Sequence, residues 1–156
     1  MAGTMLTLGL ALAAAAPPPA LAQPSLAPLA SFVGHCWAGE APGNGGLDTH
    51  CFEPVFGGQH VRDRHVVRAG GADVYWGESL YSAEGGKLGF TYWNSLGGLG
   101  RGTAVADGDV LRFTGSVHAT PQAHEERYST VWRKVDGGYE VRDGDAGAVR
   151  LFRRTD

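Results

Sequence analysis

Asp63 and His65 are the two residues of this sequence whose types and spacing best suit acid–base chemistry. They stand two positions apart in the run 60–68, HVRDRHVVR, which has the composition of a β-strand. Because side chains alternate across a strand, residues at this spacing lie side by side on one face. A carboxylate beside an imidazole fixes the histidine tautomer, which suits a general base. The alternative is a structural role for Asp63, in a buried polar pair that bonds to backbone and water.

Other patterns of catalysis or metal binding are missing from the sequence. There is no G-x-S-x-G nucleophile elbow and no H-E-x-x-H zinc motif. The glycine-rich run 97–102 lacks the Lys-Ser/Thr ending of a phosphate loop and predicts a flexible hairpin turn. The six histidines are scattered, and His60 and His65 face opposite sides of their strand. The spacing therefore predicts no metal site.

The only two cysteines, Cys36 and Cys51, lie in strand-like runs on either side of a loop rich in Gly, Pro and Asn. The stretch 32–56 therefore predicts a β-hairpin with a long connection. A disulfide between the two cysteines would join the first two strands and contribute about 3 kcal/mol in the chain-entropy account. Two buried free thiols are the alternative. Neither cysteine belongs to a C-x-x-C pair, which argues against metal ligation.

The first 22 residues have the pattern of a bacterial-type signal peptide. The apolar run 6–16 has the length of its hydrophobic region, and Ala20-Leu21-Ala22 matches an A-x-A cleavage site. We therefore expect a periplasmic or secreted protein whose residues 23–156 form one domain. A disordered Ala/Pro leader is the alternative. No later apolar run is long enough for a transmembrane segment.

Glycine-containing turns separate short runs rich in Val, Tyr, Trp, Phe and Thr along the rest of the chain. This composition favours β-strands joined by tight turns, and no helical period follows residue 31. Residues 25–31 could form one short helical turn before the first strand. The sequence thus predicts an all-β fold, an antiparallel up-and-down β-barrel of about 8–10 strands. A two-sheet sandwich is the structural alternative.

Strand alternation then assigns residues to the two faces of the barrel. In the run 60–68, Arg62, Arg64 and Arg68 share a parity and should face water, which turns Asp63 and His65 inward. The same argument gives an aromatic interior with a few polar groups, typical of a ligand cavity but also of a packed core. The candidate ligand-binding residues are His65, Tyr92, Asn94, Tyr128, Thr130 and Trp132.

The first strand resembles that of lipocalin-like (calycin) barrels, in which a short helix leads into a strand with a G-x-W motif. The residues here are Gly34-His35-Cys36-Trp37-Ala38-Gly39. The stretch is most similar to nitrobindin-like haem-binding barrels, which read G-x-W-x-G-x-G, and also resembles uncharacterised secreted bacterial lipocalin-like domains. One extra residue separates Gly34 from Trp37, and Glu40 replaces the last glycine. Trp37 is expected to have a structural role, as a plug for one end of the barrel.

Composition and resemblance together predict an exported barrel that binds a small apolar or amphipathic molecule. In nitrobindin-like barrels a histidine near the C-terminus ligates haem, but the last histidine here is His124, so that ligand is not carried over. One alternative is a small enzyme that uses Asp63 and His65. Another is a haem-binding barrel with His65 or a tyrosine as axial ligand. The net charge of −3 and the scattered basic residues predict no binding of nucleic acid.

Overall fold

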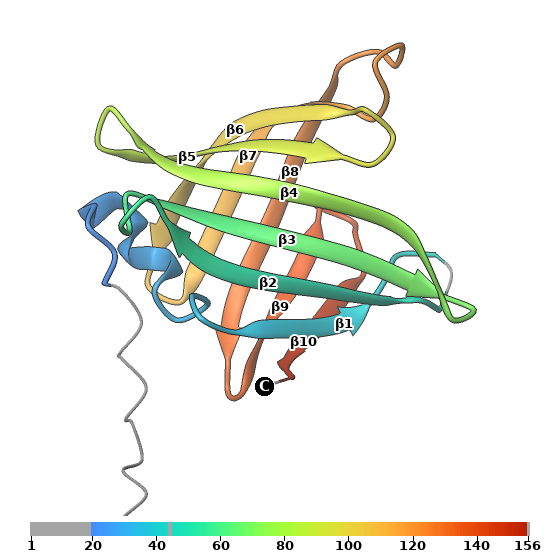
Figure 1. The fold of residues 1–156 in the computed structure, drawn as a ribbon, viewed down its shortest axis with the longest axis horizontal. Coiled ribbons are helices and arrows are strands. Elements are labelled where there is room, and N and C mark those ends of the chain that lie inside the picture. The colour runs from blue at the N-terminus through green and yellow to red at the C-terminus, as the bar shows by residue number, and fades with distance from the viewer. Residues whose placement is uncertain (1–19, 44, 156) are drawn as a thin grey trace, which may run out of the picture.

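The computed structural model describes residues 20–43 and 45–155, and in this part the chain forms a closed antiparallel barrel of ten strands (Figure 1). The strands are β1 (Cys36–Glu40), β2 (Leu47–Val55), β3 (His60–Ala69), β4 (Ala72–Glu84), β5 (Lys87–Asn94), β6 (Leu99–Asp107), β7 (Val110–His118), β8 (Glu126–Val135), β9 (Gly138–Asp143) and β10 (Val149–Arg154). Each strand pairs with the next along the chain, and β10 closes the barrel against β1. The predicted up-and-down barrel is confirmed, and the sandwich is wrong. Most of the predicted signal peptide, residues 1–19, lies outside the described residues.

Tight glycine turns join neighbouring strands, as the β3–β4 hairpin illustrates. Gly70 and Gly71 connect the paired residues Ala69 and Ala72, and both adopt positive φ angles of 59° and 82°. Two consecutive positive φ angles define the turn whose twist matches that of the flanking strands, and glycine adopts them without a steric penalty. The short connections keep consecutive strands adjacent around the whole barrel.

A short 3-10 helix, η1 (Pro24–Leu29), covers one end of the barrel (Figure 1). Leu26 and Leu29 are completely buried, and the helix contacts β3, β4 and β5. The following residue Phe32 is also buried and packs its ring against Phe52, Trp132 and Tyr139. The helical turn expected at 25–31 is therefore present and closes this end with apolar side chains.

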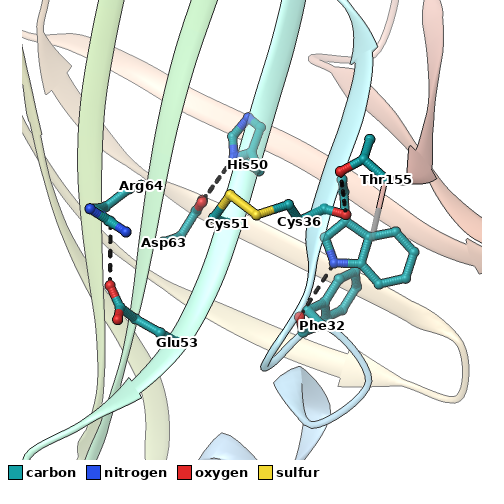
Figure 2. Close-up of a disulfide and its surroundings, with 9 residues drawn as sticks. Phe32, Cys36, His50, Cys51, Glu53, Asp63, Arg64 and Thr155 are labelled. Carbon is teal, nitrogen blue, oxygen red and sulfur yellow. Dashed lines mark hydrogen bonds and ion pairs between the residues drawn. A yellow bond between two sulfur atoms is a disulfide. The ribbon is translucent and has the colours of Figure 1, made fainter.

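A disulfide joins Cys36 on β1 to Cys51 on β2 (Figure 2). The two residues are direct partners in the antiparallel ladder, so their side chains leave the sheet on the same face. Trp37 has the opposite parity, points into the barrel and donates from its indole N–H to the carbonyl of Phe32 at 3.3 Å. The predicted disulfide is confirmed, and it lies on the outer face of the barrel.

The glycine-rich run 97–102 is only partly a turn, which corrects the sequence-based expectation. β6 begins at Leu99, so Gly100 and Gly102 are strand residues, paired with Tyr92 and Phe90 of β5. A side chain at Gly102 would lie 2.7 Å from the ring of Phe90 and 2.1 Å from a backbone oxygen of β7. Gly102 therefore leaves interior space for the ring of Phe90. This reason lies in the packing of neighbouring strands, so local turn preferences do not reveal it.

The faces of β3 agree with the alternation argument. Arg62 and Arg64 pair with Glu53 on the outer surface, and Arg68 pairs with Asp73 there. Asp63, by contrast, is only 2% exposed. In β4 the interior residues are Tyr75, Gly77, Ser79 and Tyr81. The barrel wall therefore places its charged side chains outside, with a small polar set as the exception.

Candidate functional site

The barrel interior contains a cavity of about 620 Å³. Its apolar lining includes Phe90, Phe113, Trp132, Tyr139 and Phe152. Its polar lining includes Asp48, His50, Asp63, His65, Tyr75, Tyr92, Asp143 and Arg150. The volume is within the range of roughly 300–1,000 Å³ that small-molecule sites occupy. The interior is thus hollow, with an aromatic part and a polar part.

The candidate residues from the sequence separate into two groups. His65, Tyr92, Tyr128 and Trp132 line the cavity. Asn94 instead stabilises the turn after β5, where its side-chain oxygen accepts from the amides of Leu96 and Gly98. Thr130 is buried and donates to the carbonyl of Arg142. Neither Asn94 nor Thr130 lines the cavity, so the ligand-binding role predicted for them has no support from their position.

The polar part is a cross-strand cluster on β2 and β3. His50 and His65 are direct partners in the ladder, and their rings stack with centroids 4.8 Å apart. Asp63 contacts Nδ1 of His50 at 2.9 Å, and Asp48 contacts Nδ1 of His65 at 3.3 Å (Figure 2 shows the first contact). Asp48 also lies 3.4 Å from Nε2 of His50. The four side chains therefore form two diagonal Asp–His pairs, which the contact between Asp48 and His50 links.

This arrangement corrects the expected Asp63–His65 pair. Both residues face the interior of β3 as the alternation predicted, but the hydrogen-bond partner of Asp63 is His50 of the neighbouring strand. In the ladder Asp63 lies directly opposite Phe52, and His50 is its diagonal neighbour on the interior face. Diagonal neighbours on two strands remain within reach of aromatic and long side chains. The strand register therefore brings the ring of His50 to Asp63 as its hydrogen-bond partner.

Burial and neighbouring charges shift the pKa values of His50 and Asp48 in opposite directions. Burial alone would lower the pKa of His50, but the charge of Asp63 and hydrogen bonds to both aspartates raise this pKa to about 10. Burial alone would raise the pKa of Asp48, but hydrogen bonds from His50 and His65 hold it well below its usual range. The cluster is thus a charged network in the barrel wall, with an ionised Asp48 between two imidazoles.

Tyrosine hydroxyls and an arginine extend this network. The other ring nitrogen of His65, Nε2, lies 3.1 Å from the hydroxyl of Tyr92, which is also hydrogen-bonded to the hydroxyl of Tyr75. Burial, followed by the contact with Tyr75, raises the pKa of Tyr92 well above its usual value. Arg150 of β10 lies 2.6 Å from Asp143 and 3.7 Å from Asp48. Six strands, β2, β3, β4, β5, β9 and β10, therefore contribute to one polar region.

Tyr139 differs from the other polar residues of the cavity because its hydroxyl has no hydrogen-bond partner among the described residues. The side chain is 1% exposed, and burial raises its pKa well above the usual value, with Asp63 and Asp48 adding to the effect. A buried hydroxyl without a partner costs about 1–3 kcal/mol. Tyr139 therefore offers one unused polar atom at the cavity wall.

Three polar residues of the cavity were not predicted from the sequence: Asp48, His50 and Arg150. Asp48 and His50 alternate with Cys51 along β2, so their inward direction follows from a disulfide on the outer face. The signal was thus present, but it required the Cys36–Cys51 pairing and the alternation to be combined. Arg150 had no such signal, because a charged residue in a short C-terminal strand is usually exposed. One ligand atom each from Asp48, His50 and His65 lies within 4.8 Å of the others, a set that could hold a metal ion.

Comparison with known proteins does not assign this chain to a family. No protein-family model matches it, and no curated protein matches it either. Among the described residues, no helix is long and apolar enough to cross a membrane. The fold and cavity define the class: a closed, antiparallel, ten-stranded β-barrel with a hollow interior, an architecture consistent with the lipocalin-like resemblance of the first strand.

Proposed function

We propose that the protein binds a small apolar or amphipathic molecule inside its barrel. The observation that carries this proposal is the cavity of about 620 Å³, bounded by aromatic rings and by a separate polar region. A packed barrel would fill this space with its own side chains. His65, Tyr92, Tyr128 and Trp132 would contact the ligand, the aromatic rings through apolar area and His65 through its polar edge.

Tyr139 supports the amphipathic character of the proposed ligand. Its unpartnered hydroxyl would gain a hydrogen bond from a ligand hydroxyl or carbonyl, while Phe113 and Trp132 would contact the hydrocarbon part. A buried polar atom that only a ligand satisfies lowers the stability of the empty barrel and raises affinity for the occupied one. This balance is typical of a site selected for binding over stability.

Export forms the second part of the proposal. The leader pattern at 1–22 and the disulfide both fit a periplasmic or secreted protein, because disulfides persist in oxidising compartments. The mature chain would begin at Gln23. Mass spectrometry of the protein recovered from a secreting host would give this mass, and a full-length mass in that fraction would contradict cleavage at this position.

The nitrobindin-like and enzymatic alternatives have less support. An axial haem ligand needs a ring nitrogen that faces open space, but both nitrogens of His65 contact other side chains, Asp48 and Tyr92. The macrocycle around a haem iron cannot enter the space between Nδ1 and a carboxylate 3.3 Å away. These residues therefore do not fit haem. Catalysis by Asp63 and His65 stays a prediction. It has less support because Asp63 is hydrogen-bonded to His50 and not to His65.

Binding can be tested with N-phenyl-1-naphthylamine, an apolar probe that fluoresces when it leaves water. A Gly100→Leu variant would direct a side chain into the cavity next to Tyr92, where a Cβ has ordinary contact distances of 3.4–3.5 Å. We expect this variant to fold and to lose most probe fluorescence. The matched control is Val105→Leu, an exposed residue on the same strand, which should bind as the wild type does.

The role of Tyr139 can be tested by competition between the same probe and 1-dodecanol. Tyr139→Phe should weaken dodecanol binding by about 0.5–1.5 kcal/mol, because one hydrogen bond is lost. It should leave the affinity for the probe unchanged. Wild-type protein that binds neither compound, with the folded spectrum intact, would contradict the proposed function.

A further inference from the structure

The cluster of Asp48, His50 and His65 has the donor set of a transition-metal site. Each residue provides one ligand atom, and these atoms lie within 4.8 Å of one another. Two imidazole nitrogens and one carboxylate oxygen are ligands that Zn²⁺ binds at about 2.0–2.2 Å. All three residues line the cavity, so a fourth coordination position would face the space inside the barrel.

The distances within the cluster fit tetrahedral coordination. Bonds of about 2.0–2.1 Å at tetrahedral angles separate neighbouring ligand atoms by about 3.3–3.4 Å. Oδ2 of Asp48 lies 3.4 Å from Nε2 of His50, and Oδ1 of the same carboxylate lies 3.3 Å from Nδ1 of His65. These separations are longer than the usual 2.7–2.9 Å of a charge-assisted hydrogen bond. A small rotation of the Asp48 carboxylate would therefore let one of its oxygens and the two ring nitrogens face a single ion.

Outer hydrogen bonds already orient both histidines for this role. Nδ1 of His50 faces Asp63, and Nε2 of His65 faces the hydroxyl of Tyr92. A metal-binding histidine characteristically donates its second N–H to a carboxylate or another oxygen, which fixes the tautomer and ring orientation. Both outer partners would accept an N–H here, so the remaining nitrogen of each ring is free to point at Asp48.

The charge of this region favours a divalent cation. Asp48 and Asp63 are 5% and 2% exposed, and Arg150 makes its shorter ion pair with Asp143 rather than with Asp48. The two buried carboxylates carry two negative charges, which a divalent ion bound by neutral imidazoles would balance. Buried charges are stable only when paired, so full neutralisation stabilises this part of the wall.

Gly77 is an independent indication that the space beside His65 must stay free of another side chain. It pairs with His65 across β3 and β4, and a Cβ built on it would lie 2.6 Å from Nε2 of His65. It would also lie 2.8 Å from the ring of Tyr92. Any side chain at position 77 would therefore displace the outer hydrogen bond of His65.

We propose that Asp48, Nε2 of His50 and Nδ1 of His65 bind one divalent transition-metal ion of the Zn²⁺ type, with an open position toward the cavity. Asp63 and Tyr92 are the outer partners that hold the two imidazoles. The metal site does not depend on the binding of an apolar molecule, so either proposal can fail without the other.

Isothermal titration calorimetry with Zn²⁺ tests the proposal on tag-free mature protein that has been treated with a chelator. We expect one ion per chain and a rise of the thermal midpoint on binding. Asp48→Asn and His65→Gln, which are close in size to the native residues, should abolish this binding. Asp63→Asn should weaken it by about 10–100-fold, as the loss of an outer partner does.

The matched control is His60→Gln, because His60 lies on the same strand but bonds to Ser82. It should bind Zn²⁺ as the wild type does, and circular dichroism checks that all variants fold. Absence of saturable binding to the wild type would overturn the proposal, as would unchanged binding to Asp48→Asn and His65→Gln. If these two variants do not fold, anomalous scattering from Zn²⁺-soaked wild-type crystals decides. A peak between the three residues supports the site, and no peak or a peak elsewhere overturns it.

Discussion

The end of the barrel beneath η1 and the wall formed by β2 and β3 contain opposite kinds of side chain. Phe52 of β2 packs below η1 against Phe32, whereas Asp48 lies four residues farther along the same strand in the polar cluster. Four residues correspond to only about 13 Å. The covered end is closed and aromatic, and the polar wall borders a cavity. One strand thus contributes to an apolar core at one end and to a polar cluster at the other.

The physical difference lies in how the two regions satisfy their side chains. Under η1, stability comes from apolar area removed from water, which needs no exact partner geometry. In the polar wall, each buried charge needs a specific partner, so the loss of one member leaves another unpaired. We therefore expect substitutions under η1 to change mainly stability. Substitutions in the polar wall should change binding as well as stability.

The largest expected effect is that of Phe32→Ala, at the covered end. Phe32 is 2% exposed and contacts four aromatic rings, so its removal should lower the free energy of unfolding by about 3–5 kcal/mol. Urea unfolding measures this change. Phe56→Ala, at a position that is 76% exposed, is the control and should change stability by about 0.5 kcal/mol or less. Equal effects of the two substitutions would contradict the assigned role of η1.

Reduction of the disulfide should have the next largest effect. Cys36 and Cys51 are 15 residues apart, and the chain-entropy account gives about 3 kcal/mol for a loop of this size. The mature protein should show no reactive thiol before reduction and two after it, with a lower urea midpoint. The double variant Cys36→Ala/Cys51→Ala should resemble the reduced protein and should not respond to reductant. If reductant lowered the urea midpoint of this variant, the effect of reductant would not come from the Cys36–Cys51 disulfide.

Gly77→Ala should have an intermediate effect and should act on the polar wall. Its Cβ would meet His65 and Tyr92, and such overpacking costs about 1–3 kcal/mol. Gly100→Ala is a matched interior glycine beside Tyr92 with ordinary contacts, so its cost should be smaller. Urea unfolding compares the two variants. A Gly77→Ala protein as stable as Gly100→Ala would show that the wall can adjust to the extra methyl group.

The smallest expected effect on the free energy of unfolding is that of alkaline pH, counted for each buried tyrosine. Burial raises the pKa values of Tyr81, Tyr128 and Tyr139 above the ordinary value of about 10. Below pH 10 both folded and unfolded chains keep these protons, so the three tyrosines add no pH dependence. Above pH 10 the unfolded chain loses them first. The free energy of unfolding should then fall by about 1.4 kcal/mol per pH unit for each tyrosine.

Tyr139→Phe is the control for this pH dependence. It removes one of the three groups, so the decline above pH 10 should become shallower by about 1.4 kcal/mol per pH unit. At neutral pH the same variant should be slightly more stable, because the unpartnered hydroxyl is gone. Urea unfolding at several pH values measures both effects, and an unchanged slope would mean that the Tyr139 hydroxyl ionises in the folded protein.

Local sequence patterns determined the all-β class, the strand positions, the disulfide and the interior face of β3. These features depend on nearest neighbours along the chain: glycines that accept positive φ angles, as Gly70 and Gly71 do, and alternation with a period of two. The arginines of β3 fixed its faces because their burial would be far more costly than that of Asp63 and His65. These features can be predicted without knowing which strands pair with one another.

The partners of the polar residues were decided only by the tertiary structure. Strand register placed His50 opposite His65 and brought Asp63 to His50, although Asp63 and His65 are closer in sequence. Closure of the barrel brought Arg150 to Asp48, residues that are about a hundred positions apart. Gly102 lies in a strand beside Phe90 of β5, whose ring occupies the space that a side chain at position 102 would need. Register, closure and shared volume are properties of several strands at once, so no single stretch of sequence contains them.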